Sequence, residues 1–533
     1  MTERMPQHGA DGARNAPVHL PAGMRAPAGL VEAALGYEAA LMSDDLGALE
    51  GYFAPGAATL RGDEGGLLVG RETITRFRGR RGGAPKRVIE ALHVRPIDDD
   101  HAWLMAVTAP LAGGRGLVSQ LWERQSGVWR IAAAHVSAPS PALDPRVWRV
   151  VGEPLLPPTA AGPLDGHTVA VKDVFAVEGF RRGAGVPAFL DEAEPQPRSA
   201  ASLDALRTAG ASVRGIARTD QFAYSIAGRN AAYGTPPNPA VPGAISGGSS
   251  SGPAAAVAMG HASIGLATDT AGSIRIPASY QGLWGLRTTH GAVSTAGVLP
   301  LAPSFDTVGW LTRDRATLEA AATASLAGAA QVGLGDRFVT ASALVGSATS
   351  AVASAFVTYL EVWEREVTAV EDDSLNDIAL DAVCADFRTV QAFEAWAAHG
   401  DWVAAHPGAL GTDVAARFEW ASTITPDTAA AARAALAEAR CALDDALGDA
   451  VLVLPSAASV APALDAAGDE IEAVRAATLR MTAVAGATGR PALSVPALTA
   501  EGAPIGVCFV GPRGSDLALI RASRDWMPRA KRR

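Results

Sequence analysis

The chain has 533 residues, 48% hydrophobic and 19% charged, and its 45 basic and 55 acidic residues give a formal net charge of −10. This length allows two or three domains with sizeable cores. The charge balance excludes the basic surface typical of nucleic-acid-binding proteins. Three scattered cysteines form neither a disulfide framework nor a paired metal motif, and no signal core or long apolar run is found. We expect a cytoplasmic protein with no metal, cofactor, nucleic-acid or membrane partner.

The first part of the chain predicts a disordered tail followed by a small α+β domain. Residues 1–24 are polar, whereas residues 25–136 hold helical spacing first and alternating strands later. The expected helices are 30–42, 45–53 and 71–77, and the expected strands are 57–60, 67–69, 88–94, 102–109, 117–123 and 128–136. Helices followed by antiparallel strands indicate a small curved sheet wrapped around a helix.

Within this segment, Tyr52-Phe53-Ala54, Gly70-Arg71 and the closing run Trp129 to Ser137 resemble the SnoaL-like superfamily of cone-shaped α+β barrels. The resemblance is to the variety associated with amidases of ureido-compound and cyanuric-acid breakdown. It implies a ligand pocket and a homodimer. Five basic side chains are candidates for a pocket that favours an anion: Arg61, Arg71, Arg76, Arg78 and His135. The alternative is that these side chains form a solvated face or contact the second domain.

Residues 137–163 contain seven prolines, which predicts an extended linker between two domains. From residue 164 to residue 533, apolar strand patterns alternate with helical ones. Strands are expected at 169–174, 212–216, 262–267, 451–454, 492–495 and 505–510, and helices at 200–208, 253–259, 315–326, 350–367, 426–447 and from 516. This alternation predicts an α/β domain whose sheet is covered by helices on both faces.

The stretch from Ser246 to Ser279 organises the second domain. It has two Gly/Ser turns, Gly247–Gly252 and Thr268–Ser273, separated by a short helix pattern and an apolar strand pattern. A strand between the turns would bring them together, with serines from both facing one cavity. A structural or linker role for these turns is the alternative.

Lysine is rare in this chain, which uses arginine for nearly every positive charge. Only Lys86, Lys172 and Lys531 occur, and Lys172 ends an apolar strand pattern. An arginine keeps its proton near neutral pH, whereas a desolvated lysine can lose it. Lys172 is therefore a candidate neutral base, and the alternative is a strand-end lysine paired with Asp173.

Several motifs, in order along the chain, resemble the amidase signature family. They are Lys172 after its strand, Gly247–Gly252, Asp269–Pro277, Gly234 with Asn238-Pro239, Gly285-Leu286-Arg287 and Gly489–Pro496. The region Gly285 to Trp310 is most similar to indole-acetamide hydrolases of the plant type. The resemblance implies the amidase signature fold, a mixed central sheet covered by helices on both faces.

The resemblance also implies a Lys-Ser-Ser catalytic set. Lys172 matches the base, Ser249 the bridging serine that follows a cis peptide bond, and Ser273 the nucleophile, 24 residues after Ser249. The oxyanion would be stabilised by the backbone N–H groups of Thr270, Ala271, Gly272 and Ser273. Ser246, Ala271 and Pro253 depart from the usual family pattern, and none of them removes a catalytic group.

Candidates for substrate binding are Ser250, Arg275 and Arg229. The two arginines would bind a substrate carboxylate or serve the fold. The segments Tyr224–Tyr233 and Asn376–Trp420 are expected to line the site. Their aromatic residues suit an apolar acyl group or belong to the core: Phe387, Phe393, Trp396 and Trp420.

The sequence thus predicts an amidase that hydrolyses a small carboxamide through a Ser273 acyl-enzyme. A carboxybiuret- or allophanate-type ureido hydrolase is the main alternative. A tRNA amidotransferase subunit, a non-catalytic binding or scaffold protein, and an α/β-hydrolase whose G-x-S-x-G elbow presents Ser250 are weaker ones. A phosphate-binding loop is excluded because no G-K-[ST] follows the glycines.

Overall fold

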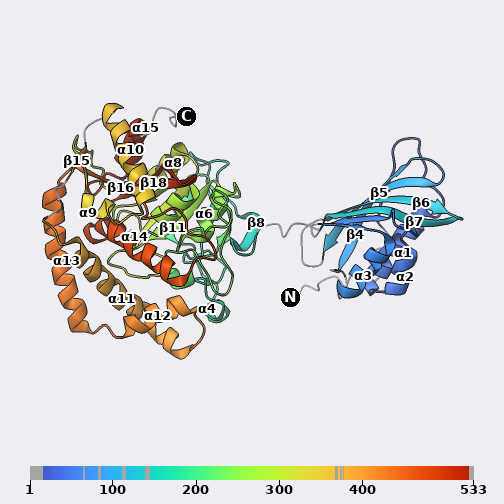
Figure 1. The fold of residues 1–533 in the computed structure, drawn as a ribbon, viewed down its shortest axis with the longest axis horizontal. Coiled ribbons are helices and arrows are strands. Elements are labelled where there is room, and N and C mark those ends of the chain that lie inside the picture. Colours follow the sequence, from blue (N-terminus) through green and yellow to red (C-terminus); the bar gives the residue numbers. More distant parts are fainter. Residues whose placement is uncertain are drawn as a thin grey trace. The chain divides into compact units, whose positions relative to one another are not determined.

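The computed structural model describes residues 16–63, 66–81, 84, 86–110, 116–137, 144–366, 370–372, 375 and 377–526. The chain divides into two compact units, residues 1–143 and residues 144–533 (Figure 1). Each unit has its own hydrophobic core.

The smaller unit is a curved sheet with three helices packed on it (Figure 1). Within the described residues the strand order is β1-β4-β5-β6-β7-β2-β3. The strands are β1 (Val18–His19), β2 (Leu60–Asp63), β3 (Gly66–Val69), β4 (Arg87–Pro96), β5 (His101–Pro110), β6 (Gly116–Gln125) and β7 (Val128–Ser137), and the helices are α1 (Leu30–Ser43), α2 (Leu46–Gly51) and α3 (Arg71–Arg81). Phe53, Trp122 and Ile131 lie at the centre of the core.

The predicted helices and long strands of this unit are present, but the predicted tail is too long. Residues 1–15 lie outside the described residues. Val18 and His19 pair in parallel with Leu92 and His93 of β4, so the sheet takes in part of the segment that we expected to be disordered. The pairing with β4 supplies backbone hydrogen bonds to this segment, and a polar composition does not reveal them.

The larger unit is a mixed α/β structure. Within the described residues eleven strands form one sheet in the order β15-β14-β16-β18-β17-β12-β13-β11-β9-β10-β8. These strands are β8 (Trp148–Leu156), β9 (Thr168–Lys172), β10 (Ser212–Ala217), β11 (Ile264–Asp269), β12 (Trp284–Arg287), β13 (Thr307–Thr312), β14 (Phe338–Thr340), β15 (Val370–Asp372), β16 (Val451–Pro455), β17 (Ala492–Ala500) and β18 (Ala503–Val510).

Helices cover both faces of this sheet. Leu266 and Ala267 are consecutive in β11, so their side chains point to opposite faces, and they belong to different core clusters. The helices are α4 (Pro187–Glu192), α5 (Ala201–Thr208), α6 (Ser251–Ala258), α7 (Arg275–Gln281), α8 (Arg315–Ser325), α9 (Ser342–Val345), α10 (Ser350–Glu366), α11 (Leu380–Ala405), α12 (Thr412–Ser422), α13 (Pro426–Leu447), α14 (Gly468–Thr488) and α15 (Asp516–Trp526). Figure 1 shows α11 and α13 side by side at one edge of the unit.

The predicted linker at 137–163 is wrong for its second half. Residues 148–156 form β8, which pairs antiparallel with β10 at the edge of the large sheet, and Trp148 is buried. The prolines misled the prediction because an edge strand tolerates them: Pro154 lacks an N–H, and one side of an edge strand needs none. The larger unit therefore begins near residue 144 and not at residue 164.

The described residues contain neither a membrane-spanning helix nor a group of metal-ligating side chains. Among these residues, no helix combines the length and the apolar character needed to cross a membrane. In the same residues, no three His, Cys, Asp or Glu side chains are grouped so that they could hold a metal ion.

Candidate active site

Lys172 lies at the end of β9 and is completely buried. Its Nζ donates hydrogen bonds to Ser249 Oγ at 2.8 Å and to Thr268 Oγ1 at 2.7 Å. Asp173, the partner that a structural lysine would use, instead lies 3.0 Å from Arg149 Nε and accepts from the Gly183 N–H. Lys172 therefore faces hydroxyl groups and not a salt-bridge partner.

Burial lowers the pKa of Lys172 to about 7, because the charged ammonium loses its hydration. The carboxylates of Asp220, Asp269 and Asp306 act in the opposite direction but do not restore the ordinary value. A substantial fraction of Lys172 is neutral at neutral pH, which is the state that a base requires.

Ser249 links Lys172 to Ser273. The Gly248–Ser249 peptide bond is cis, as expected, and Ser249 Oγ donates to Ser273 Oγ at 3.0 Å. The Ser249 carbonyl accepts from Thr219 Oγ1 at 2.8 Å. Gly248 has no room for a side chain, since a Cβ there would lie 2.4 Å from Asp220 Oδ2. The two Gly/Ser turns thus meet through their serines, and Lys172, Ser249 and Ser273 form one hydrogen-bonded row.

Ser273 lies in the turn between β11 and α7 and is only 3% exposed. Four N–H groups were predicted to stabilise an oxyanion. The prediction is wrong for Gly272, because its N–H donates to Asp269 Oδ1 at 2.9 Å. Gly272 has φ +122°, a conformation that favours glycine. Among the described residues no acceptor faces the N–H groups of Thr270, Ala271 and Ser273, so these three stay available.

Arg275 does not bind substrate, contrary to one of our two expectations. It is 1% exposed, its Nε and Nη2 donate to the two oxygens of Asp269 at 3.0 and 2.9 Å, and its Nη1 donates to the Thr482 carbonyl at 3.0 Å. Asp269 also lies 3.2 Å from Arg287 Nη1. Burial by itself would raise the pKa of Asp269, but Arg275 and Arg287 outweigh it and hold that pKa well below its usual range. Arg275 therefore fixes the turn that carries Ser273.

The other two substrate-binding candidates are also engaged within the protein. Ser250 is fully buried and its Oγ donates to the Thr268 carbonyl at 3.2 Å. Arg229 Nη2 donates to the Leu464 carbonyl at 2.6 Å. Residues 241–250 contain no strand, so the nucleophile elbow that would present Ser250 is absent from this described segment.

A narrow pocket opens onto Ser273. It is lined by Ala223, Tyr224, Ser225, Ile226, Ala271, Ser273, Leu301, Gln391, Arg475 and Leu479. The predicted segment Tyr224–Tyr233 thus contributes its first residues, and Gln391 comes from the second predicted segment. Asn376, where that second segment begins, lies outside the described residues.

The aromatic side chains predicted as a lining for the acyl group lie elsewhere. Phe387 is fully buried against Phe305, with ring centroids 4.3 Å apart. Phe393 and Trp420 lie under the guanidinium groups of Arg433 and Arg388, and Trp396 packs against a second hydrophobic cluster. None of the four lines the described pocket. Their helical spacing reflects packing of α11 and α12.

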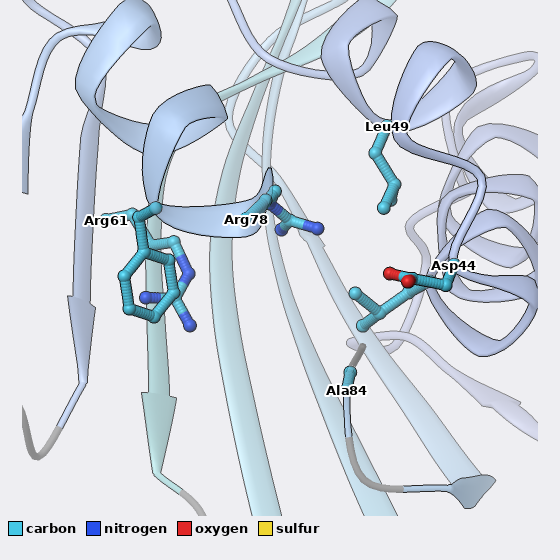
Figure 2. Close-up of a pocket in the computed structure, with 7 residues that line it drawn as sticks. Asp44, Leu49, Arg61, Arg78 and Ala84 are labelled. Atoms are coloured by element: carbon cyan, nitrogen blue, oxygen red, sulfur yellow. The ribbon is translucent and has the colours of Figure 1, made fainter. Parts of the chain in front are cut away.

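The smaller unit has a narrow pocket of its own. Figure 2 shows Arg61 and Arg78 beside Asp44, Leu49 and Ala84. Arg78 Nη2 donates to the Tyr37 hydroxyl at 2.6 Å, and its Nε and Nη1 are buried without a partner among the described residues. Three other expected residues, Arg71, Arg76 and His135, do not line this pocket.

Sequence reasoning missed Thr268, Asp220 and Arg475. Thr268 and Asp220 surround the row: Thr268 accepts from Lys172, and Asp220 accepts from the Gly228 N–H and the Ser251 hydroxyl. Burial raises the pKa of Asp220 to about 6. The available signal for Thr268 was a hydroxyl residue at the end of the apolar pattern that precedes Ser273. No signal identified Arg475, because its helix was not predicted.

Two family models match the chain. The model described as Amidase matches residues 157–327, and the model described as AtzH-like matches residues 25–141. Amidase 1 of Arabidopsis thaliana is 32% identical to this chain over 392 residues, which cover 67% of this chain and 91% of the plant protein.

Solved structures resemble the larger unit. A crystal structure of an amidase has a TM-score of 0.63 and 30% identity, and covers 68% of this chain and 86% of its own. Another neighbour, from a study of a vestigial protein complex and the origins of an s-triazine catabolic enzyme, has a TM-score of 0.62 and 26% identity, with 69% and 84% of the two chains covered. The mixed sheet with helices on both faces is the amidase signature fold.

Proposed function

Because this chain belongs to the amidase family, we propose that it hydrolyses a small carboxamide to a carboxylate and ammonia through an acyl-enzyme on Ser273. The enzyme is an amidohydrolase that acts on linear amide C–N bonds. The observation that carries the proposal is the buried row from Lys172 Nζ through Ser249 Oγ to Ser273 Oγ, with steps of 2.8 and 3.0 Å.

In the proposed first step, neutral Lys172 accepts a proton from Ser249 while Ser249 accepts the proton of Ser273. The hydroxyl hydrogens rotate freely enough for both hydrogen bonds to reverse direction. One N–H of Lys172 stays on Thr268 Oγ1, so its lone pair is left for Ser249. Ser273 Oγ attacks the amide carbon, and the N–H groups of Thr270, Ala271 and Ser273 stabilise the oxyanion.

In the second step, the C–N bond breaks and the proton held by Lys172 returns through Ser249 to the departing nitrogen, which leaves as ammonia. Water then attacks the Ser273 ester and gives up one proton along the same row. The ester C–O bond breaks, Ser273 regains its hydrogen, and the substrate acyl group leaves as a carboxylic acid, whose remaining proton passes to the released ammonia to give a carboxylate and ammonium. Atoms and charges balance without a metal or a cofactor.

The test is ammonia release from a panel of amides by the wild type, Lys172→Ala and Ser273→Ala. The panel contains indole-3-acetamide, aliphatic amides, malonamate, biuret and a carboxylated urea. The proposal expects one class of amide to be hydrolysed by the wild type and neither variant to hydrolyse it. Full activity of Ser273→Ala would overturn the proposal.

A second candidate function is hydrolysis of a carboxylated urea, as in carboxybiuret or allophanate breakdown. Two observations favour it: the AtzH-like match over residues 25–141 and the similarity of the larger unit to a protein described with an s-triazine catabolic enzyme. We infer a SnoaL-like cone for the smaller unit, whose curved sheet carries a pocket lined by Arg61 and Arg78. Ammonia release confined to carboxylated ureas would favour this function, whereas efficient hydrolysis of indole-3-acetamide would favour the indole-acetamide type.

A further inference from the structure

Arg475 is the one charged side chain among the residues that line the described Ser273 pocket. It comes from α14, far along the chain from the Gly/Ser turns, and is 9% exposed. Ser273 and Arg475 therefore line the same narrow pocket.

One nitrogen of the Arg475 guanidinium donates to a protein acceptor, and the other two have no acceptor among the described residues. Its Nη1 donates to Glu472 Oε1 at 2.6 Å. Its Nε is buried without a hydrogen-bond partner, and no described residue accepts from Nη2. Nε and Nη2 lie on the same edge of the planar group and match the two oxygens of a carboxylate.

Two other arginines of this protein use that same edge to hold carboxylates. Arg275 binds Asp269 through Nε and Nη2 at 3.0 and 2.9 Å. In the smaller unit, Arg87 binds Glu38 through the same two atoms at 2.6 and 2.9 Å. In Arg475, which lines the pocket, the same donor pair has no acceptor among the described residues. A buried donor without an acceptor is unfavourable, and the carboxylate of a ligand in this pocket would supply the acceptor.

The charges around Arg475 also favour an anion. Arg417 and Arg388 are close enough to contribute, after burial, to the lowered pKa of Arg475, which nevertheless stays protonated at neutral pH. Glu472 is half exposed and is shared, since it also lies 3.6 Å from Arg417 Nη2. Asp413 pairs with Arg417 at 3.1 Å. The three arginines therefore outnumber the two carboxylates in this cluster, which leaves it with a net positive charge.

We propose that Arg475 binds the carboxylate of an anionic amide substrate, through Nε and Nη2, while Ser273 attacks the amide carbon at the other end of that substrate. This inference rests on the proposed amidase function. It assigns the substrate class: monoamides of short dicarboxylic acids and carboxylated ureas are preferred, and neutral amides such as indole-3-acetamide are poor substrates.

The experiment compares two amides of similar shape, malonamate and 3-methylbutanamide, in which a carboxylate replaces an isopropyl group. The ratio of their kcat/KM values is measured for the wild type, Arg475→Met, Arg475→Lys and Arg480→Met. Arg480 lies on the same helix and pairs with Ser347 and Asp381 outside the pocket, which makes it the matched control.

We expect the wild type to prefer malonamate. Arg475→Met lowers kcat/KM for malonamate by about 10- to 100-fold, the effect of a charge-assisted hydrogen-bonded pair. It leaves 3-methylbutanamide within about threefold, and this residual turnover shows that the variant is folded. Arg475→Lys keeps the charge but loses the two-pronged geometry, so its loss is smaller. Arg480→Met keeps the wild-type ratio.

Two results would overturn the assignment: a wild type that prefers the neutral amide, or an Arg475→Met variant that loses both activities equally. Ser273→Ala separates this outcome from failure of the proposed function. If Ser273→Ala stays active on either amide, the acyl-enzyme proposal fails. If it is inactive while the Arg475 variants keep the wild-type ratio, only the carboxylate assignment fails.

Discussion

Two buried arginines beside the same catalytic turn are in opposite states. Arg275, at the start of α7, has every direction filled: Asp269 takes Nε and Nη2, and the Thr482 carbonyl takes Nη1. Arg475, on α14, donates to Glu472 through Nη1, and its Nε has no acceptor among the described residues. Both side chains are charged and nearly inaccessible, so burial alone does not distinguish a structural arginine from a ligand-binding one.

This difference separates two classes of polar group at the site. Asp269 and Arg275, which hold the catalytic turn, are satisfied within the protein, because a buried charge without a partner is strongly unfavourable. The groups that we propose to meet the substrate keep open donors: the N–H groups of Thr270, Ala271 and Ser273, and the Nε of Arg475. Substitutions separate these two classes, because they change activity and the free energy of unfolding to different extents.

Ser273→Ala removes the nucleophile and should give the largest effect on activity. We expect kcat to fall by about 10⁴-fold or more, with little change in stability, because its Oγ accepts a single hydrogen bond from Ser249. Steady-state ammonia release and thermal unfolding measure the two quantities. A variant that keeps more than a tenth of wild-type kcat would contradict the assignment.

Lys172→Arg should lower kcat/KM by about 10³-fold, because arginine does not release its proton at neutral pH. The wild type supplies a second readout. Burial lowers the pKa of Lys172 to about 7, and the neutral amine is the active form. Activity therefore increases as the pH rises through about 7 and is lost below it. A profile that stays flat across neutral pH is incompatible with this base.

Arg275→Met tests the arginine whose hydrogen bonds are made within the protein. It leaves Asp269 with one fewer cation in a fully buried position, and breaking such a pair reduces the free energy of unfolding by about 3–5 kcal/mol. Arg475→Met should change that free energy by about 1 kcal/mol at most, since its partner Glu472 is half exposed. Urea denaturation of both variants gives the comparison. Equal losses would remove the distinction between the two arginines.

Thr268→Val gives the smallest expected effect. It keeps the shape of the side chain but removes the acceptor that orients Lys172, so kcat should fall by about 5- to 10-fold. Thr268→Ser, which keeps the hydroxyl, is the matched control and should stay near wild type. A valine variant as active as the serine variant would show that Lys172 needs no second partner.

The sequence was most informative where chemistry depends on local motifs. The two Gly/Ser turns predicted serines facing one cavity, and the rarity of lysine singled out Lys172 as a candidate base. The resemblance of these motifs to the amidase signature family implied the set of Lys172, Ser249 and Ser273, and the structure brings these side chains together. The long strands β4 to β7 of the smaller unit also followed their alternation closely, whereas the strand expected at 57–60 is found at Leu60–Asp63. Local patterns specify these features because turn residues and burial alternation act over a few positions.

What the sequence could not supply depends on contacts between distant segments. The role of Arg275 rests on Asp269 and on Thr482, a residue of α14 more than two hundred positions away. Arg475 reaches the pocket only because α14 packs there, and this Ala-rich helix was not predicted. The assignment of the Gly272 N–H to the oxyanion was wrong because the Asp269 side chain folds back onto its own turn and accepts from that N–H. Each difference is a hydrogen-bond partner that spacing does not reveal.

The most direct test of the acyl-enzyme is mass spectrometry of the full chain, acid-quenched during turnover of malonamate. We predict an added acyl mass that maps to Ser273 after proteolysis, a loss of that mass as hydrolysis proceeds, and no adduct on Ser273→Ala. An adduct on Ser250, or continued turnover by Ser273→Ala without any adduct, would contradict the account.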